Sequence, residues 1–402
     1  MVGSGIDAPR YVGVREPQEV ADPGTTLAAM SDAPAAPIDP ADALDRITYL
    51  MDRTLAPSQK VAAFAKARGI VDEVGDEQIR ELVRTGKLEE LPGIGKSTGS
   101  VIRQAVNGEV PDRLVELERT SVLPTTDAGN EYRKLLKGDL HLHSNWSDGG
   151  AEIDAMARAA QALGHEYMVL TDHSPRLTVA HGLNRERLLH QLEVVAALNE
   201  ELAPFRILTG IEVDILEDGA LDQHEDLLGQ LDLVVASVHS KLKMPREEMT
   251  RRMVLAMASP HTDVLGHCTG RKVSKEQVAR VLEGRDQPDA EVPDDWDRDA
   301  NPVRPQSNFD AEIVFAACAK FDKAVEINCR PERQDPPDHL LELALEYGCK
   351  ISIDTDAHAP GQLEWQVFGC DKAARHEIEP DRIINTWDVE RLLEWTASHP
   401  TI

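Results

Sequence analysis

The stretch that decides the fold is GDLHLHSNWSDG, at residues 138–149. A short apolar run ends in His141 and His143, and Asp148 follows in the next segment. Successive side chains of a strand point to opposite faces, so His141 and His143 are predicted to share one face. The stretch therefore predicts a buried strand with two imidazoles side by side at its carboxyl end.

The same pattern recurs along the chain. Six more short apolar runs follow the first run (139–143), at residues 167–171, 206–213, 231–238, 263–267, 324–328 and 350–354. Segments with helical periodicity lie between them, at residues 153–163, 185–202, 247–258 and 339–347. Strands that alternate with helices indicate a parallel sheet, so the fold class is α/β, and the length suits a seven-stranded β/α barrel.

Polar side chains gather where the predicted strands end. The candidates are His141, His143, Asp148, His173, Glu212, His239, His267, Asp356 and His358. The carboxyl ends of the strands of a barrel meet at one mouth, and imidazole and carboxylate are ligands of zinc, manganese and iron. Nine ligands exceed the needs of one ion. We therefore predict two or three divalent metal ions (Zn, Mn or Fe), bridged by Glu212 and Asp356.

Basic residues follow several of these strand ends. Arg271 and Arg333 are expected to act in catalysis, and Arg176 and Lys241 to bind a phosphate. The alternative is that these four side chains are ordinary surface charges, because long cations also line protein faces. Clustered metal ions suit phosphoester hydrolysis, since they stabilise charge on phosphoryl oxygens.

The order of the motifs resembles that of the PHP (polymerase and histidinol phosphatase) family. HLHSNWSDG at 141–149, TDH at 171–173, GIEVDI at 210–215, SVHS at 237–240, GH at 266–267, EIN at 326–328 and DTDAH at 354–358 follow the family pattern over residues 136–402. The resemblance implies a distorted barrel that binds three metals through the nine residues above and hydrolyses phosphoesters. One departure is Cys268, which stands where a proline is common and whose thiol could alter metal selectivity.

A separate domain is expected before the barrel. Residues 1–38 are predicted to be a disordered tail, 39–120 a helical domain, 121–135 a polar linker and 136–402 the barrel. An acid-rich stretch at 284–307 is predicted to be a surface loop of the barrel.

The helical domain contains LPGIGKS at residues 91–97. Gly93 and Gly95 allow a tight turn, and Lys96 begins a predicted helix whose positive end can hold one DNA phosphate. The stretch resembles a helix-hairpin-helix motif and the N-terminal domain of bacterial family-X DNA polymerases; the alternative is a plain packing unit. A polymerase core has no room between Arg119 and Gly138, and Val101 stands where a lyase of that family needs a lysine.

Composition limits the possible partners. The chain has 402 residues, with 43 basic and 71 acidic side chains and a net charge of −28, so any contact with DNA must be local. The five separated cysteines and the lack of a long apolar run indicate a cytoplasmic protein without a membrane partner.

We therefore expect a metal-dependent phosphoesterase that acts on DNA ends or nucleotides, as a 3′–5′ exonuclease or 3′-phosphatase in DNA repair. One alternative is a small-molecule phosphatase of the histidinol-phosphatase type, with the helical domain as an interaction module. The other is a non-enzymatic DNA-binding protein that keeps its metals for stability.

Overall fold

The computed structural model describes residues 38–283, 304 and 306–399. Nearly all of the expected tail (1–38) and most of the expected acidic loop (284–307) lie outside the described residues. The chain forms two compact units: the first ends at Val122 and also includes Gly150–Ala155, and the second comprises Leu123–Gly149 and the residues from Met156 onward.

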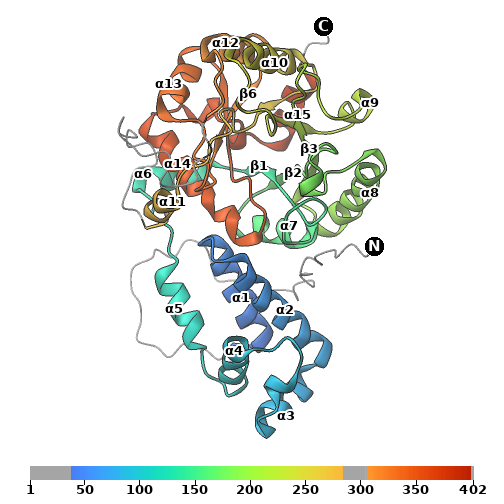
Figure 1. The fold of residues 1–402 in the computed structure, drawn as a ribbon, viewed down its shortest axis with the longest axis vertical. Coiled ribbons are helices and arrows are strands. Elements are labelled where there is room, and N and C mark those ends of the chain that lie inside the picture. The colour runs from blue at the N-terminus through green and yellow to red at the C-terminus, as the bar shows by residue number, and fades with distance from the viewer. Residues whose placement is uncertain (1–37, 284–303, 305, 400–402) are drawn as a thin grey trace. The chain divides into compact units, whose positions relative to one another are not determined.

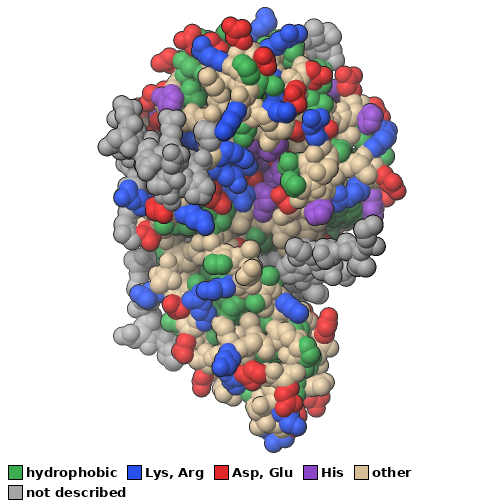
Figure 2. Space-filling view, viewed as in Figure 1, with side chains coloured by type: hydrophobic (Ala, Val, Ile, Leu, Met, Phe, Trp, Pro, Cys, Tyr) green, Lys and Arg blue, Asp and Glu red, His purple; other side chains and the backbone are tan. Residues whose placement is uncertain are grey.

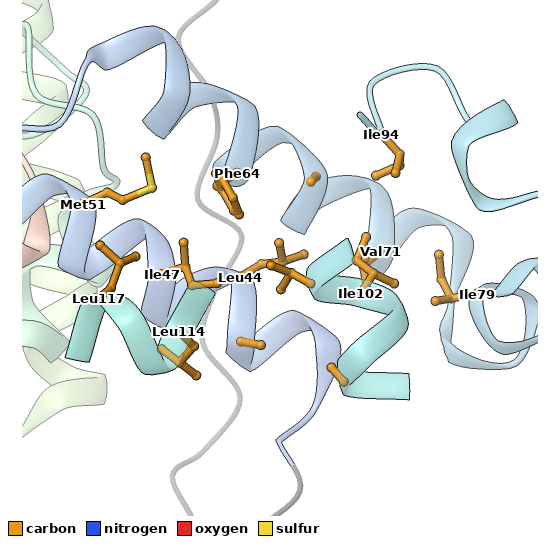
Figure 3. Packing of buried hydrophobic residues seen from close by; sticks show 14 of the residues in the cluster. Leu44, Ile47, Met51, Phe64, Val71, Ile79, Ile94, Ile102, Leu114 and Leu117 are labelled. Carbon is orange, nitrogen blue, oxygen red and sulfur yellow. The ribbon is translucent and has the colours of Figure 1, made fainter. Parts of the chain in front are cut away.

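The first unit is helical. Its elements are α1 (Pro40–Arg53), α2 (Ser58–Val74), α3 (Asp76–Thr85), the 3-10 helix η1 (Leu88–Glu90), α4 (Lys96–Val106) and α5 (Asp112–Thr120). Apolar residues spaced three and four apart place one face of each longer helix against a shared core. Figure 3 shows Ile47 of α1, Phe64 of α2, Ile102 of α4 and Leu114 of α5 pointing into this core.

The segment expected to be a linker contains a helix. Residues 121–135 include α6 (Asp127–Leu135), which belongs to the second unit and packs against α14 (Gln366–Arg375). The hydroxyl and backbone amide of Thr126 both donate to Asp371, at 2.6 and 3.0 Å. A side chain at Gly129 would collide with the same Asp371. Gly129 therefore allows α6 to pack closely against α14.

The second unit is built on a single parallel sheet, as predicted. Its strands are β1 (Gly138–Leu142), β2 (Tyr167–Leu170), β3 (Arg206–Asp214), β4 (Leu233–Ser237), β5 (Val264–Leu265), β6 (Ala324–Asn328) and β7 (Lys350–Asp354), and they pair in sequence order. Leu142 bridges Ala357 in parallel fashion, and the amide of Asp356 donates to His141 at 2.9 Å. These contacts join the last strand to the first, so the sheet forms a nearly closed barrel.

Helices surround these strands (Figure 1). They are α7 (Ile153–Ala162), α8 (Arg185–Leu202), α9 (Glu225–Leu228), α10 (Arg246–Ala258), α11 (Lys275–Leu282), α12 (Ala311–Lys320), α13 (Asp338–Glu346), α14 and α15 (Val389–Ala397). The four helices expected from periodicity, at 153–163, 185–202, 247–258 and 339–347, are confirmed within one residue at each end.

The amino ends of the strands are closed by an apolar core. The first halves of six strands contribute Leu140, Tyr167, Val169, Leu208, Leu233, Val235, Val264 and Ala324. Trp387, Leu392 and Trp395, from α15 and the turn before it, pack against them. Polar side chains are consequently concentrated at the carboxyl ends. Within the described residues, no helix has the length and apolar character needed to cross a membrane.

Candidate metal centre

The barrel brings all nine candidate ligands to one end. His141 and Glu212 lie on strands β1 and β3, and the other seven follow the ends of β1, β2, β4, β5 and β7. Glu212 is also bridged to His173 through the backbone. Figure 2 shows histidines (purple) in a recess on the face of the barrel unit, with basic side chains (blue) beside them.

Glu212 lies in the middle of this group and is 1% exposed. Its carboxylate oxygens lie near imidazole nitrogens of His173 (2.8 Å), His267 (2.9 Å), His239 (3.2 Å), His141 (3.5 Å) and His143 (3.7 Å). One carboxylate that faces five imidazoles has the arrangement of a bridging ligand, because its two oxygens can serve two ions.

A second group lies nearer the surface. Asp148 is 3.4 Å from Nε2 of His173 and 3.3 Å from Nε2 of His358. Asp356 is 3.4 Å from Nε2 of His143, which itself stacks within 4.3 Å of the His358 ring. Three sets have ligand atoms within 4.8 Å of one another: His143, Asp148, His173 and His358; His141, His143 and Glu212; and His173, Glu212 and His239. The geometry is thus consistent with more than one metal ion.

Buried polar atoms without hydrogen bonds support this interpretation. They include Nε2 of His141, both ring nitrogens of His143 and His239, and Oε2 of Glu212. A buried polar atom without a partner costs free energy, so such atoms are rare in folded proteins. Divalent cations would satisfy this donor set, and the residues present therefore fit the implied metal ions.

The pKa values in the cluster diverge. Burial favours the neutral form of His239, but Glu212 outweighs it and raises the pKa of His239 to about 9. Burial and the neighbouring imidazoles of His358 and His173 lower the pKa of His143 to about 3. Glu212 is buried too, but the imidazoles around it hold its pKa well below the usual range. Glu212 is therefore ionised at neutral pH, and its negative charge attracts cations.

Carboxylates behind the imidazoles orient them. Oε1 of Glu326 lies 2.5 Å from Nδ1 of His141, which leaves Nε2 directed toward Glu212. Asp214 accepts the backbone amide of His239 at 3.0 Å and lies 3.7 Å from its Nδ1. Such pairs fix the tautomer of a metal-binding histidine. Neither acid was predicted from the sequence, although Glu326 lies in the EIN motif and Asp214 in the GIEVDI motif.

Asp172 organises the loop that presents Asp148. Its carboxylate accepts hydrogen bonds from the amide and hydroxyl of Ser144, the hydroxyl of Ser147 and the amide group of Gln191. All four groups are buried. The loop after β1 is therefore fixed to β2 and α8, which gives Asp148 a defined position beside His173.

Two arginines approach the ligands from the loop after β6. Nε of Arg333 lies 2.8 Å from Oδ2 of Asp356, and Arg333 is 9% exposed. Arg330, which our sequence analysis missed, donates to the Asp356 carbonyl at 2.9 Å and to Glu332 at 3.1 Å. Nothing in its local pattern distinguished Arg330 from a surface arginine.

Arg271 contacts the loop after β6. Its guanidinium donates to the backbone carbonyls of Arg333, at 3.0 Å, and Gln334. This geometry fits a residue that positions Arg333, and the catalytic role expected for Arg271 stays a prediction.

The two expected phosphate ligands lie on exposed loops. The amide of Arg176 donates to Asp222, and its guanidinium lies 4.0 Å from Asp214. Lys241 is exposed in a left-handed backbone conformation (φ 55°) just after His239.

Cys268, which follows the candidate ligand His267, is 3% exposed and its Sγ lies 3.6 Å from Asp335. Its thiol is thus directed at that carboxylate.

The predicted hairpin forms in the helical unit. Gly93 adopts a φ of 102°, which favours glycine, and Gly95 precedes the first residue of α4, Lys96. The amide of Gly95 donates to Oγ1 of Thr98 at 3.0 Å, which caps the helix. Gly93, Gly95 and Lys96 are exposed, whereas Val101 is buried in the core of the unit.

The amino-acid sequence of this chain is similar to those of known proteins. The PHP domain model matches residues 139–284. The chain is 32% identical over 339 residues to the DNA polymerase/3′-5′ exonuclease PolX of Bacillus subtilis (strain 168), which covers 83% of this chain. The chain spans only about half of that protein, 53% of its length.

A second relative is matched almost completely. The chain is 32% identical over 269 residues to a probable phosphatase of Acetivibrio thermocellus, over 64% of this chain and 93% of that protein. A solved structure, histidinol phosphate phosphatase from Lactococcus lactis complexed with zinc, L-histidinol and phosphate, aligns with a TM-score of 0.37 and 18% identity, over 60% of this chain and 93% of that one. The PHP domain match and the nearly full-length phosphatase relative lead to one conclusion: this chain belongs to the PHP family.

Proposed function

We propose that this PHP-family phosphoesterase is metal-dependent and acts on the ends of DNA, as a 3′–5′ exonuclease or 3′-phosphatase. The observation that carries the proposal is Glu212, a buried carboxylate faced by five imidazoles, each of which has at least one ring nitrogen without a hydrogen-bond partner. No apolar core or surface role requires that arrangement, whereas a multi-metal hydrolytic site does.

The residues divide the chemical work. The nine ligands would hold divalent ions, which would supply the positive charge that polarises a phosphoryl oxygen and lowers the pKa of a water molecule. Arg333, beside Asp356, can donate a charge-assisted hydrogen bond to a non-bridging phosphoryl oxygen. Arg330 and Arg271 keep Asp356 and the Arg333 backbone in place. The buried position of these groups keeps their charges effective as negative charge develops on phosphate.

Two features favour DNA as the substrate. The exposed turn at Gly93 and Gly95, before the first turn of α4, has the form of a site for one DNA phosphate. The similarity to PolX, whose name includes a 3′-5′ exonuclease, extends over 83% of this chain. Such a hairpin would bind the backbone and leave base sequence unread.

The test is hydrolysis of a fluorescently labelled single-stranded oligonucleotide with added Mn²⁺. We expect stepwise shortening or loss of a 3′-phosphate with the native chain. Asp356→Asn should abolish it, and the matched variant Asp381→Asn, an exposed acid paired with Arg391, should not. Equal activity in both variants would refute the proposed site.

The small-molecule phosphatase remains the second candidate. The probable phosphatase of Acetivibrio thermocellus is matched over 93% of its length, and the match covers only 64% of this chain, so the barrel suffices for that relative. The net charge of −28 would also repel DNA. Intact DNA together with rapid hydrolysis of a phosphate monoester, in the same assay, would favour this candidate.

A further inference from the structure

A group of basic side chains lies beside the candidate metal centre and extends beyond it. Arg330 and Arg333 lie at the ligands, and Lys272 and Arg304 continue the group outward. Figure 2 shows basic side chains gathered next to the histidines of the recess. This concentration of positive charge stands out in a chain with 28 more acidic than basic side chains.

The backbone holds Lys272 and Arg304 together. The two residues form an antiparallel bridge, in which the amide of Lys272 donates to the Arg304 carbonyl at 3.0 Å. Nε of Arg304 donates to the Gly270 carbonyl at 2.6 Å, and the amide of Val273 donates to the Glu332 carbonyl at 2.8 Å. These bonds connect the pair to the loop that contains Arg330 and Arg333.

The acids near this pair are engaged elsewhere. Glu332 pairs with Arg330 at 3.1 Å, and Asp356 pairs with Arg333 at 2.8 Å. Asp335 is buried and accepts from the amide and hydroxyl of Thr269. Among the described residues, Lys272 and Arg304 form no ion pair.

Burial and repulsion from neighbouring cations lower the pKa values of both residues. Burial, followed by repulsion from Arg333, lowers the pKa of Arg304 to about 10. Burial and then repulsion from Arg333 and Arg304 also lower the pKa of Lys272. An anion between these side chains would relieve the repulsion, which is the expected property of an anion subsite.

We propose that Lys272 and Arg304 form a second phosphate subsite, which holds the phosphodiester adjacent to the one at the metal centre. The substrate class is therefore an oligonucleotide with at least two backbone phosphates. This inference rests on the proposed function, and it deepens that function by separating a nucleic-acid strand from a monophosphate. The subsite would act without regard to base, since only backbone charge is contacted.

The experiment compares a dinucleotide with one phosphodiester, TpT, and a trinucleotide with two, TpTpT, in Mn²⁺. We expect kcat/KM of the native chain to be about tenfold higher for TpTpT, the gain typical of a charge-assisted contact. The double variant Lys272→Gln/Arg304→Gln should lose this gain and keep its kcat/KM for TpT. The salt dependence of the TpTpT reaction should also become shallower, because fewer phosphate contacts remain.

A matched control changes the same charge elsewhere. Arg251→Gln/Lys320→Gln removes one arginine and one lysine that are exposed on α10 and α12, and it should behave like the native chain. Circular dichroism melting curves establish that both double variants are folded. A charge effect that appears equally in the control would be a long-range effect of net charge, which would overturn the subsite.

The other outcomes also decide the matter. Three results would overturn the second subsite. The first is an equal kcat/KM for TpT and TpTpT in the native chain. The others are an unchanged ratio of the two kcat/KM values in the Lys272/Arg304 variant and an equal loss of kcat/KM on both substrates. Hydrolysis of p-nitrophenyl phosphate without hydrolysis of TpT or TpTpT would overturn it and leave a metal-dependent phosphatase. Hydrolysis of neither compound would overturn the proposed function as well.

Discussion

The two ends of the barrel use the same residue types in different ways. At the amino end, Asp263 accepts the amide of Val234 at 2.7 Å and pairs with Nδ1 of His399 at 2.8 Å. At the carboxyl end, Glu212 lies among five imidazoles, each of which has at least one ring nitrogen without a hydrogen-bond partner. Burial of histidine beside carboxylate is thus common to both ends and does not by itself indicate a function.

The two ends differ in the number of imidazoles that surround the buried carboxylate. Asp263 faces the imidazole of His399, and the Trp395 ring meets that imidazole edge-on, with 4.9 Å between the ring centroids. Glu212 has too many imidazole neighbours for hydrogen bonding alone to satisfy. Groups that are buried, convergent and unsatisfied require an external cation. The contrast predicts that mutations at one end affect chemistry, and mutations at the other affect only stability.

The largest effect is expected for Glu212→Gln. The substitution keeps the shape and removes the charge that bridges the cluster, so bound metal should fall and kcat/KM should drop on the order of 10³-fold. Metal content by mass spectrometry and hydrolysis of p-nitrophenyl phosphate are the measurements. A variant with full metal content and native activity would remove Glu212 from the centre.

The amino end provides the matched control, Asp263→Asn. This change also replaces a buried carboxylate beside an imidazole, and loss of its pair should cost about 1–3 kcal/mol of unfolding free energy. The kcat/KM and metal content should stay native, as checked by urea denaturation and the same assays. A thousandfold loss of activity here would erase the distinction between the two ends.

The strands and the group of candidate ligands at their carboxyl ends could be predicted from the sequence. Each strand was predictable because its apolar run is bounded by polar turns, and β6 and β7 were placed with their observed ends. The nine residues at the carboxyl end were predictable as a group because parallel strands end at one mouth. His141 and His143 share a face for the same reason that any residues two apart on a strand do.

Contacts between segments that are far apart in the chain could not be predicted from the sequence. Glu326 reaches His141, and Asp214 reaches His239, only because non-consecutive parts of the chain meet in the barrel. The direction of Arg271 toward carbonyl groups likewise depends on where the loop after β6 lies. A single sequence specifies the types of these residues but not their partners.

The second prediction concerns the residue behind a ligand. Glu326→Gln should weaken metal binding about 10- to 100-fold, because Nδ1 of His141 loses the carboxylate that fixes its tautomer. Competition with a chelating dye measures the dissociation constant. Unchanged affinity would show that the backbone alone orients His141.

The third prediction is a pH dependence that belongs to the carboxyl end. Glu212 raises the pKa of His239 to about 9, so this imidazole is protonated at neutral pH when no metal is bound. A proton competes with a cation, and metal affinity should therefore fall as pH decreases below 9, by at most about tenfold per pH unit for each such imidazole. Titrations between pH 6 and 9 test this. Asp263→Asn should give the same profile, and a flat profile in the native chain would contradict the assignment.

The smallest effect is expected at the amino end, from Lys323→Met. Lys323 lies 1% exposed before β6, its Nζ has no hydrogen-bond partner, and burial lowers its pKa to about 8 in spite of Asp263 and Asp322. Lys323 therefore loses its proton near pH 8 in the folded protein, whereas in the unfolded chain its pKa is about 10.5. The destabilisation of the folded protein by the buried charge of Lys323 is constant below pH 8 and disappears as pH rises toward 10.5.

Lys323→Met should therefore raise Tm by a few degrees at pH 7, with a smaller gain at pH 10 and native kcat/KM throughout. A lower Tm at pH 7 would show that the attraction of Asp263 and Asp322 outweighs burial. A change in kcat/KM would show that the amino end communicates with the metal centre.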